Sequence, residues 1–165
     1  MMAEERFWAL IDELGGVADD RGRHRLWLAL RRLEDGNEVL AFHDRFSEVL
    51  HRLDLRSIAT QRWRASDQPW WLPRVPGISA DGFLYARCAA VAEGRTTVEA
   101  ILAEHSAFRR RWELAEELLT VAPEAYEATT KRPFPWDRDA PYSYETGSNE
   151  LGGWRRRALP PGNPQ

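Results

Sequence analysis

The stretch GISADGFLYARCAAVAEGR, residues 77–95, contains the start, the buried face and the end of one helix. Ser79 is the expected N-cap, because its hydroxyl can accept hydrogen bonds from the free amides of the first turn. Asp81 follows in that turn, where the helix dipole favours negative charge. Apolar side chains then recur at helical spacing, at Phe83, Leu84, Cys88 and Val91. Gly94 is suited to the left-handed end of the helix.

Periodic apolar positions predict further helices on both sides of this one. Before it, three helices are expected. The first covers residues 3–14, the second begins at Asp19 and Asp20 and ends at residue 33, and the third covers 55–63. Asn37 is the expected cap of another helix, whose stripe must face other helices and consists of Val39, Phe42, Phe46, Val49 and Leu53. After residue 95, a capping box of Thr96 and Glu99 precedes a short helix, and a longer one is expected over 106–122.

Two segments lack a helical pattern. Residues 64–77 (RASDQPWWLPRVPG) hold three prolines and a tryptophan pair, so they predict a long loop. Six of the ten prolines lie from Lys131 onward. We expect residues 133–154 to form an irregular strap, fixed over the helices by aromatic side chains, and residues 155–165 to be a flexible tail. The sequence thus predicts an all-α fold, a single domain over residues 1–154 with six to eight helices and an aromatic, proline-rich C-terminal strap.

Composition restricts the classes of function. The net charge of −3 gives no global attraction to nucleic acid, which counts against binding it through arginine and tryptophan. No stretch approaches the roughly 20 apolar residues of a membrane helix, and the acidic start is unlike a signal peptide, so we expect a cytoplasmic protein with no membrane association. The single cysteine, Cys88, excludes an internal disulfide and is expected in the core.

The histidines are His24, His43, His51 and His105, and they show no metal-binding spacing. We expect them at the surface or its boundary, and we expect no metal and no cofactor. Glycine-rich phosphate loops, GxSxG elbows and zinc-protease pairs are all missing from the sequence. The sequence therefore leans away from an enzyme.

Asp81 and Arg87 are the most informative polar pair, and they admit two interpretations. In the structural one, Asp81 stabilises the helix start and Arg87 pairs with a carboxylate on a neighbouring helix. In the functional one, Ser79, Asp81 and Arg87 contact an anion or substrate where backbone amides gather, in a pocket that includes Trp8.

The loop that begins at Trp63 also has two interpretations. It interleaves aromatic rings with guanidinium groups, at Trp63, Trp70, Trp71 and Arg74. In the first, the tryptophan side chains are buried and fill the core beneath this non-helical loop, since large aromatics are mostly buried. They can instead anchor a protein partner, because tryptophan and arginine dominate interface hot spots.

Several motifs, in order along the chain, resemble the bacterial family called domain of unknown function 4240. They are Phe7-Trp8 with Ile11-Asp12, Val39-Leu40-Ala41-Phe42 with Phe46, the segment 77–83 with Tyr85 and Arg87, Gly94-Arg95, Glu117-Leu118-Leu119 with 121–126, and the tail motif SYETGSN at 143–149. The chain departs from the family pattern at Ala80 and Ala86, where the family has an aspartate and an aromatic residue. The resemblance implies no assigned activity.

We therefore expect a non-catalytic module that binds a protein partner, through the loop at 63–74 and the helix start at 79–87. The alternative is a small enzyme or a small-molecule-binding domain whose pocket lies near Asp81 and Arg87.

Overall fold

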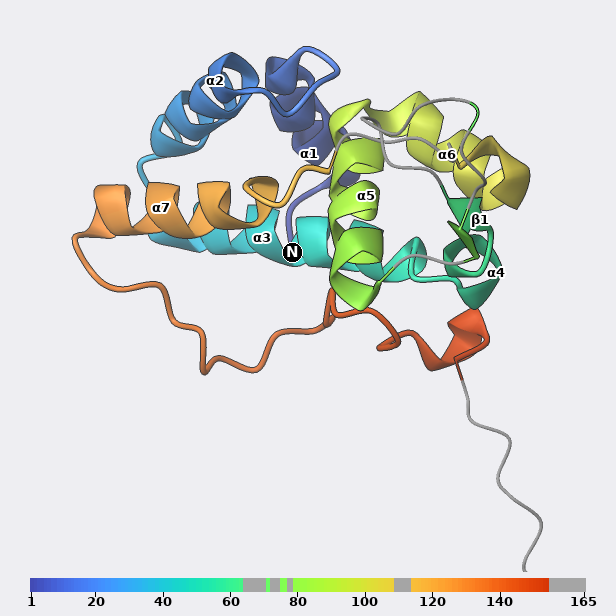
Figure 1. Ribbon diagram of the computed structural model, residues 1–165. Helices are drawn as coiled ribbons and strands as arrows, with labels where there is room; N and C mark the ends of the chain where they lie inside the picture. Colours follow the sequence, from blue (N-terminus) through green and yellow to red (C-terminus); the bar gives the residue numbers. More distant parts are fainter. Residues whose placement is uncertain (64–70, 72–74, 77–78, 109–113, 155–165) are drawn as a thin grey trace, which may run out of the picture.

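Helix α3 (Gly36–Arg52) is the longest helix, and it packs against α1, α5 and α7. The structure, a computed structural model, describes residues 1–63, 71, 75–76, 79–108 and 114–154 (Figure 1). Within these residues the other α-helices are α1 (Glu4–Ile11), α2 (Asp20–Arg31), α4 (Arg56–Ala59), α5 (Ala80–Ala92), α6 (Arg95–Ala103) and α7 (Leu118–Thr130). Short 3₁₀ segments cover Asp12–Leu14, His105–Ala107 and Glu150–Gly152. The all-α fold with seven helices in the described residues confirms the prediction.

A two-residue β-ribbon is the one departure from helix among the described elements. Strand β1 (Arg62–Trp63) pairs antiparallel with β2 (Val75–Pro76), so that Arg62 lies opposite Pro76. The ribbon closes the ends of the region that the sequence predicts to be a loop.

The apolar stripe of α3 is buried as its spacing predicts. Its buried side chains are Val39, Phe42, Phe46, Val49 and Leu50, and Leu53 follows at the C-cap. Phe42 packs on Phe7 of α1, with ring centroids 5.2 Å apart. The cap, however, is Asp35 rather than Asn37: the Asp35 carboxylate accepts a hydrogen bond of 2.8 Å from the Asn37 amide. The helix therefore begins at Gly36, two residues earlier than a cap at Asn37 would allow.

Helix α5 also begins as its sequence predicts. The Ser79 hydroxyl accepts a hydrogen bond of 3.0 Å from the Gly82 amide, and Asp81 lies exposed in the first turn. Cys88 is fully buried on the inner face, and this burial raises the pKa of its thiol to about 12. A thiol held protonated in this way behaves as a small apolar side chain, which agrees with the core position expected for it.

The predictions for two short helices, α4 and α6, are wrong in part. The helix over 55–63 ends after the four residues of α4 and gives way to β1. The capping box at Thr96 does not form, because Gly94 precedes α6 and the Glu99 carboxylate pairs with Arg95 at 2.6 Å.

The helix over 106–122 does not form either. A 3₁₀ turn covers His105–Ala107, and the next helix, α7, begins only at Leu118 and includes Pro123. The Ala115 amide donates to the Tyr85 carbonyl at 3.2 Å, so this stretch pairs with α5 instead of continuing a helix. Residues 109–113 of the predicted helix lie outside the described residues.

Beyond α7 the chain runs as an irregular segment along the lower side of α3 to the ends of α5 and α4, orange to red in Figure 1. We call residues 133–154 the strap, as in the prediction. Lys131, in the left-handed conformation, ends α7 and turns the chain towards it. None of the described helices is both long and apolar enough to cross a membrane.

A buried arginine joins α3, α5 and the strap. Arg87 of α5 has no exposed surface, and its guanidinium donates to three oxygens. These are the Leu50 carbonyl at 2.7 Å, the Tyr144 carbonyl at 2.9 Å and the Thr146 hydroxyl at 3.0 Å. Burial lowers the pKa of Arg87, and the nearby negative charge of Asp54 opposes this shift. Since hydrogen bonds to charged groups are the strong ones, we infer that this contact fixes the path of the strap.

Asp54, which follows α3, holds the strap from the other side. It is fully buried, and its Oδ2 accepts hydrogen bonds from the amides of Gly147 at 2.9 Å and Asn149 at 3.0 Å. Its carbonyl accepts a further bond of 2.9 Å from the Trp154 indole. Arg87 and Asp54 therefore both form hydrogen bonds with the tail motif at 143–149.

The variant Asp54→Ala tests this attachment. It leaves the amides of Gly147 and Asn149 without an acceptor and removes the charge that faces Arg87. We expect the free energy of unfolding to fall by about 3 kcal/mol, measured with urea. Amide hydrogen exchange at these two residues should accelerate by at least about tenfold.

Asp137→Ala is the matched control, because Asp137 is an exposed carboxylate of the same strap. It should change stability by less than about 0.5 kcal/mol. Unchanged exchange at Gly147 and Asn149 in Asp54→Ala would contradict the attachment.

Candidate functional site

The structure separates the residues that the sequence groups into one pocket. Trp8 lies in the core, 5% exposed, with its indole 3.3 Å from the Glu4 carboxylate. Asp81 is exposed at the start of α5, whereas Arg87 is fully buried under the strap. The guanidinium is bonded to two backbone carbonyls and a hydroxyl, so the prediction that it pairs with a carboxylate on a neighbouring helix is wrong.

Most of the loop at 63–74 lies outside the described residues. Trp70 and Arg74 lie outside the described residues, as does the side chain of Trp63. Trp71 is described and is 68% exposed. The role of this loop as a binding surface stays a prediction.

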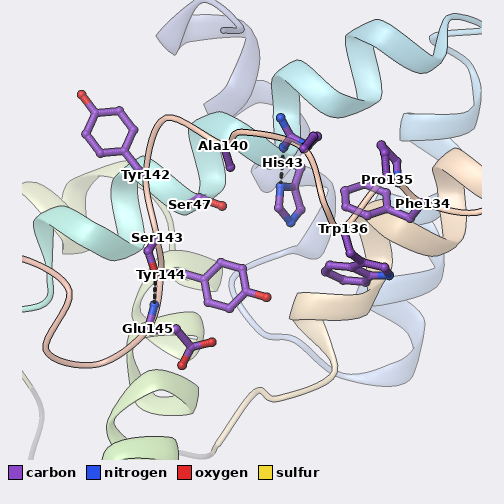
Figure 2. Close-up of a pocket in the computed structure, with 11 residues that line it drawn as sticks. His43, Ser47, Phe134, Pro135, Trp136, Ala140, Tyr142, Ser143, Tyr144 and Glu145 are labelled. Atoms are coloured by element: carbon purple, nitrogen blue, oxygen red, sulfur yellow. Dashed lines mark hydrogen bonds between the residues drawn. The ribbon is translucent and has the colours of Figure 1, made fainter.

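A cavity of about 240 Å³ lies between α3 and the strap (Figure 2). We call it the strap pocket. Its lining residues are His43 and Ser47 from α3, and Phe134, Pro135, Trp136, Arg138, Ala140, Tyr142, Ser143, Tyr144 and Glu145 from the strap. His43 and Ser47 share one face of α3 because they are a helical turn apart.

His43 is the most perturbed titratable group of the pocket. It is 7% exposed, and its imidazole lies among three aromatic rings, with centroids 4.9 Å from Phe134, 6.2 Å from Tyr144 and 6.4 Å from Trp136. Burial lowers the pKa of His43 to about 4; the charge of Arg138 adds to this shift and that of Asp44 opposes it. His43 is therefore neutral at pH 7. The expectation that it lies at the surface or its boundary is wrong, because the strap covers it.

A hydrogen bond determines the tautomer of His43. Its Nδ1 lies 3.1 Å from Nη2 of Arg138, whose guanidinium also forms an ion pair with Asp44. Arginine can only donate, so Nδ1 is the acceptor and the ring proton is on Nε2. Figure 2 shows this second nitrogen pointing into the space between Tyr144 and Trp136. The pocket thus gains a fixed N–H donor.

Ser47 places a second polar group at the pocket. The residue is 1% exposed, and its hydroxyl has no hydrogen-bond partner among the described residues. A buried polar group without a partner costs about 1–3 kcal/mol. No hydrogen bond joins Ser47 to His43 among the described residues.

Tyr144 links the strap pocket to Arg87. Its backbone carbonyl accepts the hydrogen bond from the buried guanidinium, and its half-buried ring lines the cavity with the hydroxyl directed towards Trp136 (Figure 2). Burial raises the pKa of the Tyr144 hydroxyl, and the charge of Glu145 adds to the rise. The hydroxyl therefore remains a donor at neutral pH. Arg87 therefore positions the wall formed by Tyr144, although it does not itself line the strap pocket.

The strap pocket combines aromatic walls with two neutral polar groups, the His43 imidazole and the Tyr144 hydroxyl. Sequence reasoning identified the aromatic side chains of the strap only as anchors, and it missed His43 and Ser47 as site residues. The signal for those two residues was their common face on α3, but only the path of the strap shows what covers that face. In the described residues, no group of three or more histidine, cysteine, aspartate or glutamate side chains is placed to hold a metal ion.

The pH dependence of stability tests the burial of His43. Between about pH 6.5 and about pH 4 the unfolded chain binds a proton at His43 and the folded chain does not. The free energy of unfolding should therefore fall on acidification, by on the order of 3 kcal/mol from this group. His43→Gln has no imidazole to protonate, so its free energy of unfolding should not fall in this way. Urea titrations should show the wild type losing about 3 kcal/mol relative to the variant between about pH 7 and about pH 4.

His24→Gln, at an exposed position on α2, is the control and should keep the wild-type pH dependence. A constant difference between the wild type and His43→Gln across this range would show that His43 is not buried as described.

The family match covers the part of the chain that carries one side of the strap pocket. Residues 2–128 match the family described as protein of unknown function DUF4240. This range includes His43 and Ser47 and ends before the strap. No curated protein and no solved structure matches the chain. The match spans well over half of the chain, and the chain belongs to the DUF4240 family.

Proposed function

We propose that this chain is a non-catalytic protein-interaction module, and that a partner inserts one of its residues into the strap pocket. The observation that carries the proposal is the position of Trp136. This side chain is 63% exposed at the edge of a cavity that has the buried His43 and Phe134 in its walls. A large exposed aromatic beside a preformed pocket is typical of an interface hot spot.

The size and composition of the pocket support a protein partner. Ligand pockets for drug-sized molecules measure roughly 300–1,000 Å³. The strap pocket, at about 240 Å³, is smaller and suits one inserted residue. Its tryptophan and tyrosine walls belong to the residue types enriched at protein interfaces. The exposed Trp71 and the rest of the loop at 63–74 stay a predicted second contact surface.

We also propose a cytoplasmic location in a bacterial cell. The single cysteine supports it, because Cys88 is a buried free thiol, and secreted small domains are commonly stabilised by disulfides.

A small-molecule-binding domain is the second candidate, favoured by the hydroxyl of Ser47. A buried donor without a partner is the kind of polar group that orients a small ligand in an apolar pocket. In this candidate the ligand lies in the strap pocket rather than near Asp81 and Arg87, since Arg87 is covered by the strap.

An affinity capture with matched variants tests the interaction module. Wild-type protein, Trp136→Ala and Leu151→Ala are immobilised and exposed to lysate of the native host, and the retained proteins are quantified by mass spectrometry. Leu151 is the control, because it is 91% exposed on the same strap but does not line the pocket.

We expect the wild type and Leu151→Ala to retain a stoichiometric partner. The amount of this partner retained by Trp136→Ala should be lower by at least about tenfold. Equal retention by a folded Trp136→Ala would overturn the role of the pocket. An empty capture with all three proteins would favour the small-molecule candidate.

A further inference from the structure

We infer that the strap pocket binds a proline of an extended partner segment, with the proline ring against the aromatic walls and the preceding carbonyl on His43. This inference rests on the proposed function and names the partner's chemistry. It is drawn from three properties of the pocket: a fixed donor, an aromatic enclosure and the absence of an unpaired charge near the donor.

The fixed donor requires an acceptor on the occupant. Because Arg138 donates to Nδ1 of His43, the neutral ring presents an N–H at Nε2. A carbonyl oxygen is the complementary group. The proline residue itself has no amide hydrogen, so a proline-rich segment offers acceptors without competing donors.

The aromatic enclosure favours a small saturated ring. Phe134 and Trp136 pack with centroids 4.7 Å apart and inclined by 58°, and Tyr144 faces them across the cavity (Figure 2). Grooves with such aromatic walls bind proline-rich segments, whose polyproline II conformation is already formed and costs little entropy to bind. The cavity of about 240 Å³ has the exposed Trp136 at its edge, so an inserted ring can remain attached to a chain outside it.

The charges around the pocket favour a neutral occupant. Arg138 is neutralised by its ion pair with Asp44, and His43 is uncharged at pH 7. The carboxylate of Glu145 lies in the lining and repels an anion. The Nε2–H of His43 is itself a donor, so it has no hydrogen bond to offer an ammonium group. A peptide carbonyl satisfies these conditions, whereas a carboxylate, a phosphate or an ammonium group does not.

Ser47 supplies a second test of occupancy. Its hydroxyl is buried at the α3 side of the pocket and has no partner among the described residues. Replacement by alanine removes a polar group that costs stability in the free protein. If the occupant reaches this hydroxyl, the same replacement weakens binding.

The probe is fluorescein-labelled decaproline, and binding is measured by fluorescence polarisation with a glycine–serine peptide of equal length as the negative control. We expect saturable binding of decaproline to the wild type and to Leu151→Ala. Trp136→Ala should weaken it at least about tenfold. His43→Phe, which keeps a ring but removes the donor, should weaken it about tenfold, and His43→Gln, which restores an N–H, should return it to within about threefold of the wild type.

Ser47→Ala should raise the melting temperature of the free protein, because it removes a buried hydroxyl that has no partner among the described residues. Circular dichroism establishes that each variant is folded. Absent binding to the wild type, or equal binding to Trp136→Ala and His43→Phe, would overturn the inference. So would equally tight binding of N-acetylprolinamide, because that result indicates a small-molecule site.

The two proposals fail separately. If the lysate partner depends on Trp136 but decaproline does not bind, the interaction module stands and the proline inference is wrong. If decaproline binding depends on Trp136 but no lysate protein is captured in a Trp136-dependent way, the recognition chemistry stands and the natural occupant is not a protein.

Discussion

The hydrogen bonds of one buried guanidinium hold three distant parts of this chain together. Arg87 of α5 donates to the carbonyl of Leu50 in α3 and to two groups of the strap, across sequence separations of 37, 57 and 59 residues. A buried charge is costly unless it is hydrogen-bonded, so these three bonds favour the observed position of the strap over the helices. Asp54 reinforces this position through the amides of Gly147 and Asn149.

The position of the strap creates the pocket. Once the Tyr144 carbonyl is bonded to Arg87, its ring lies opposite His43 on α3, and the strap residues before it complete the aromatic walls. The environment of His43 follows, because burial and Arg138 together keep its ring neutral. Arg87 therefore does not line the strap pocket, but it positions one of its walls through the Tyr144 carbonyl. The family match ends before the strap, so the pocket joins the matched helices to a segment outside the match.

Local signals in the sequence predict much of the fold, and long-range packing determines the site. The stripe of α3 and the cap at Ser79 depend on residues within a few positions of each other, and the sequence predicts both. The helix expected over 106–122 fails because the Ala115 amide bonds to Tyr85 of α5, a tertiary contact that no periodicity records. For the same reason His43 resembles a boundary residue in the sequence, although the strap buries it from about 90 residues away along the chain.

The protonation of His43 is the most direct measure of whether the strap closes over α3. Long-range nitrogen–proton NMR spectra of the histidine rings, recorded at about pH 5.5, distinguish the two neutral tautomers from the charged ring. The account predicts that His43 is still neutral there, with its proton on Nε2 and Nδ1 accepting from Arg138. A charged His43 ring at that pH, or a proton on Nδ1, would contradict the closed strap and the pocket built from it.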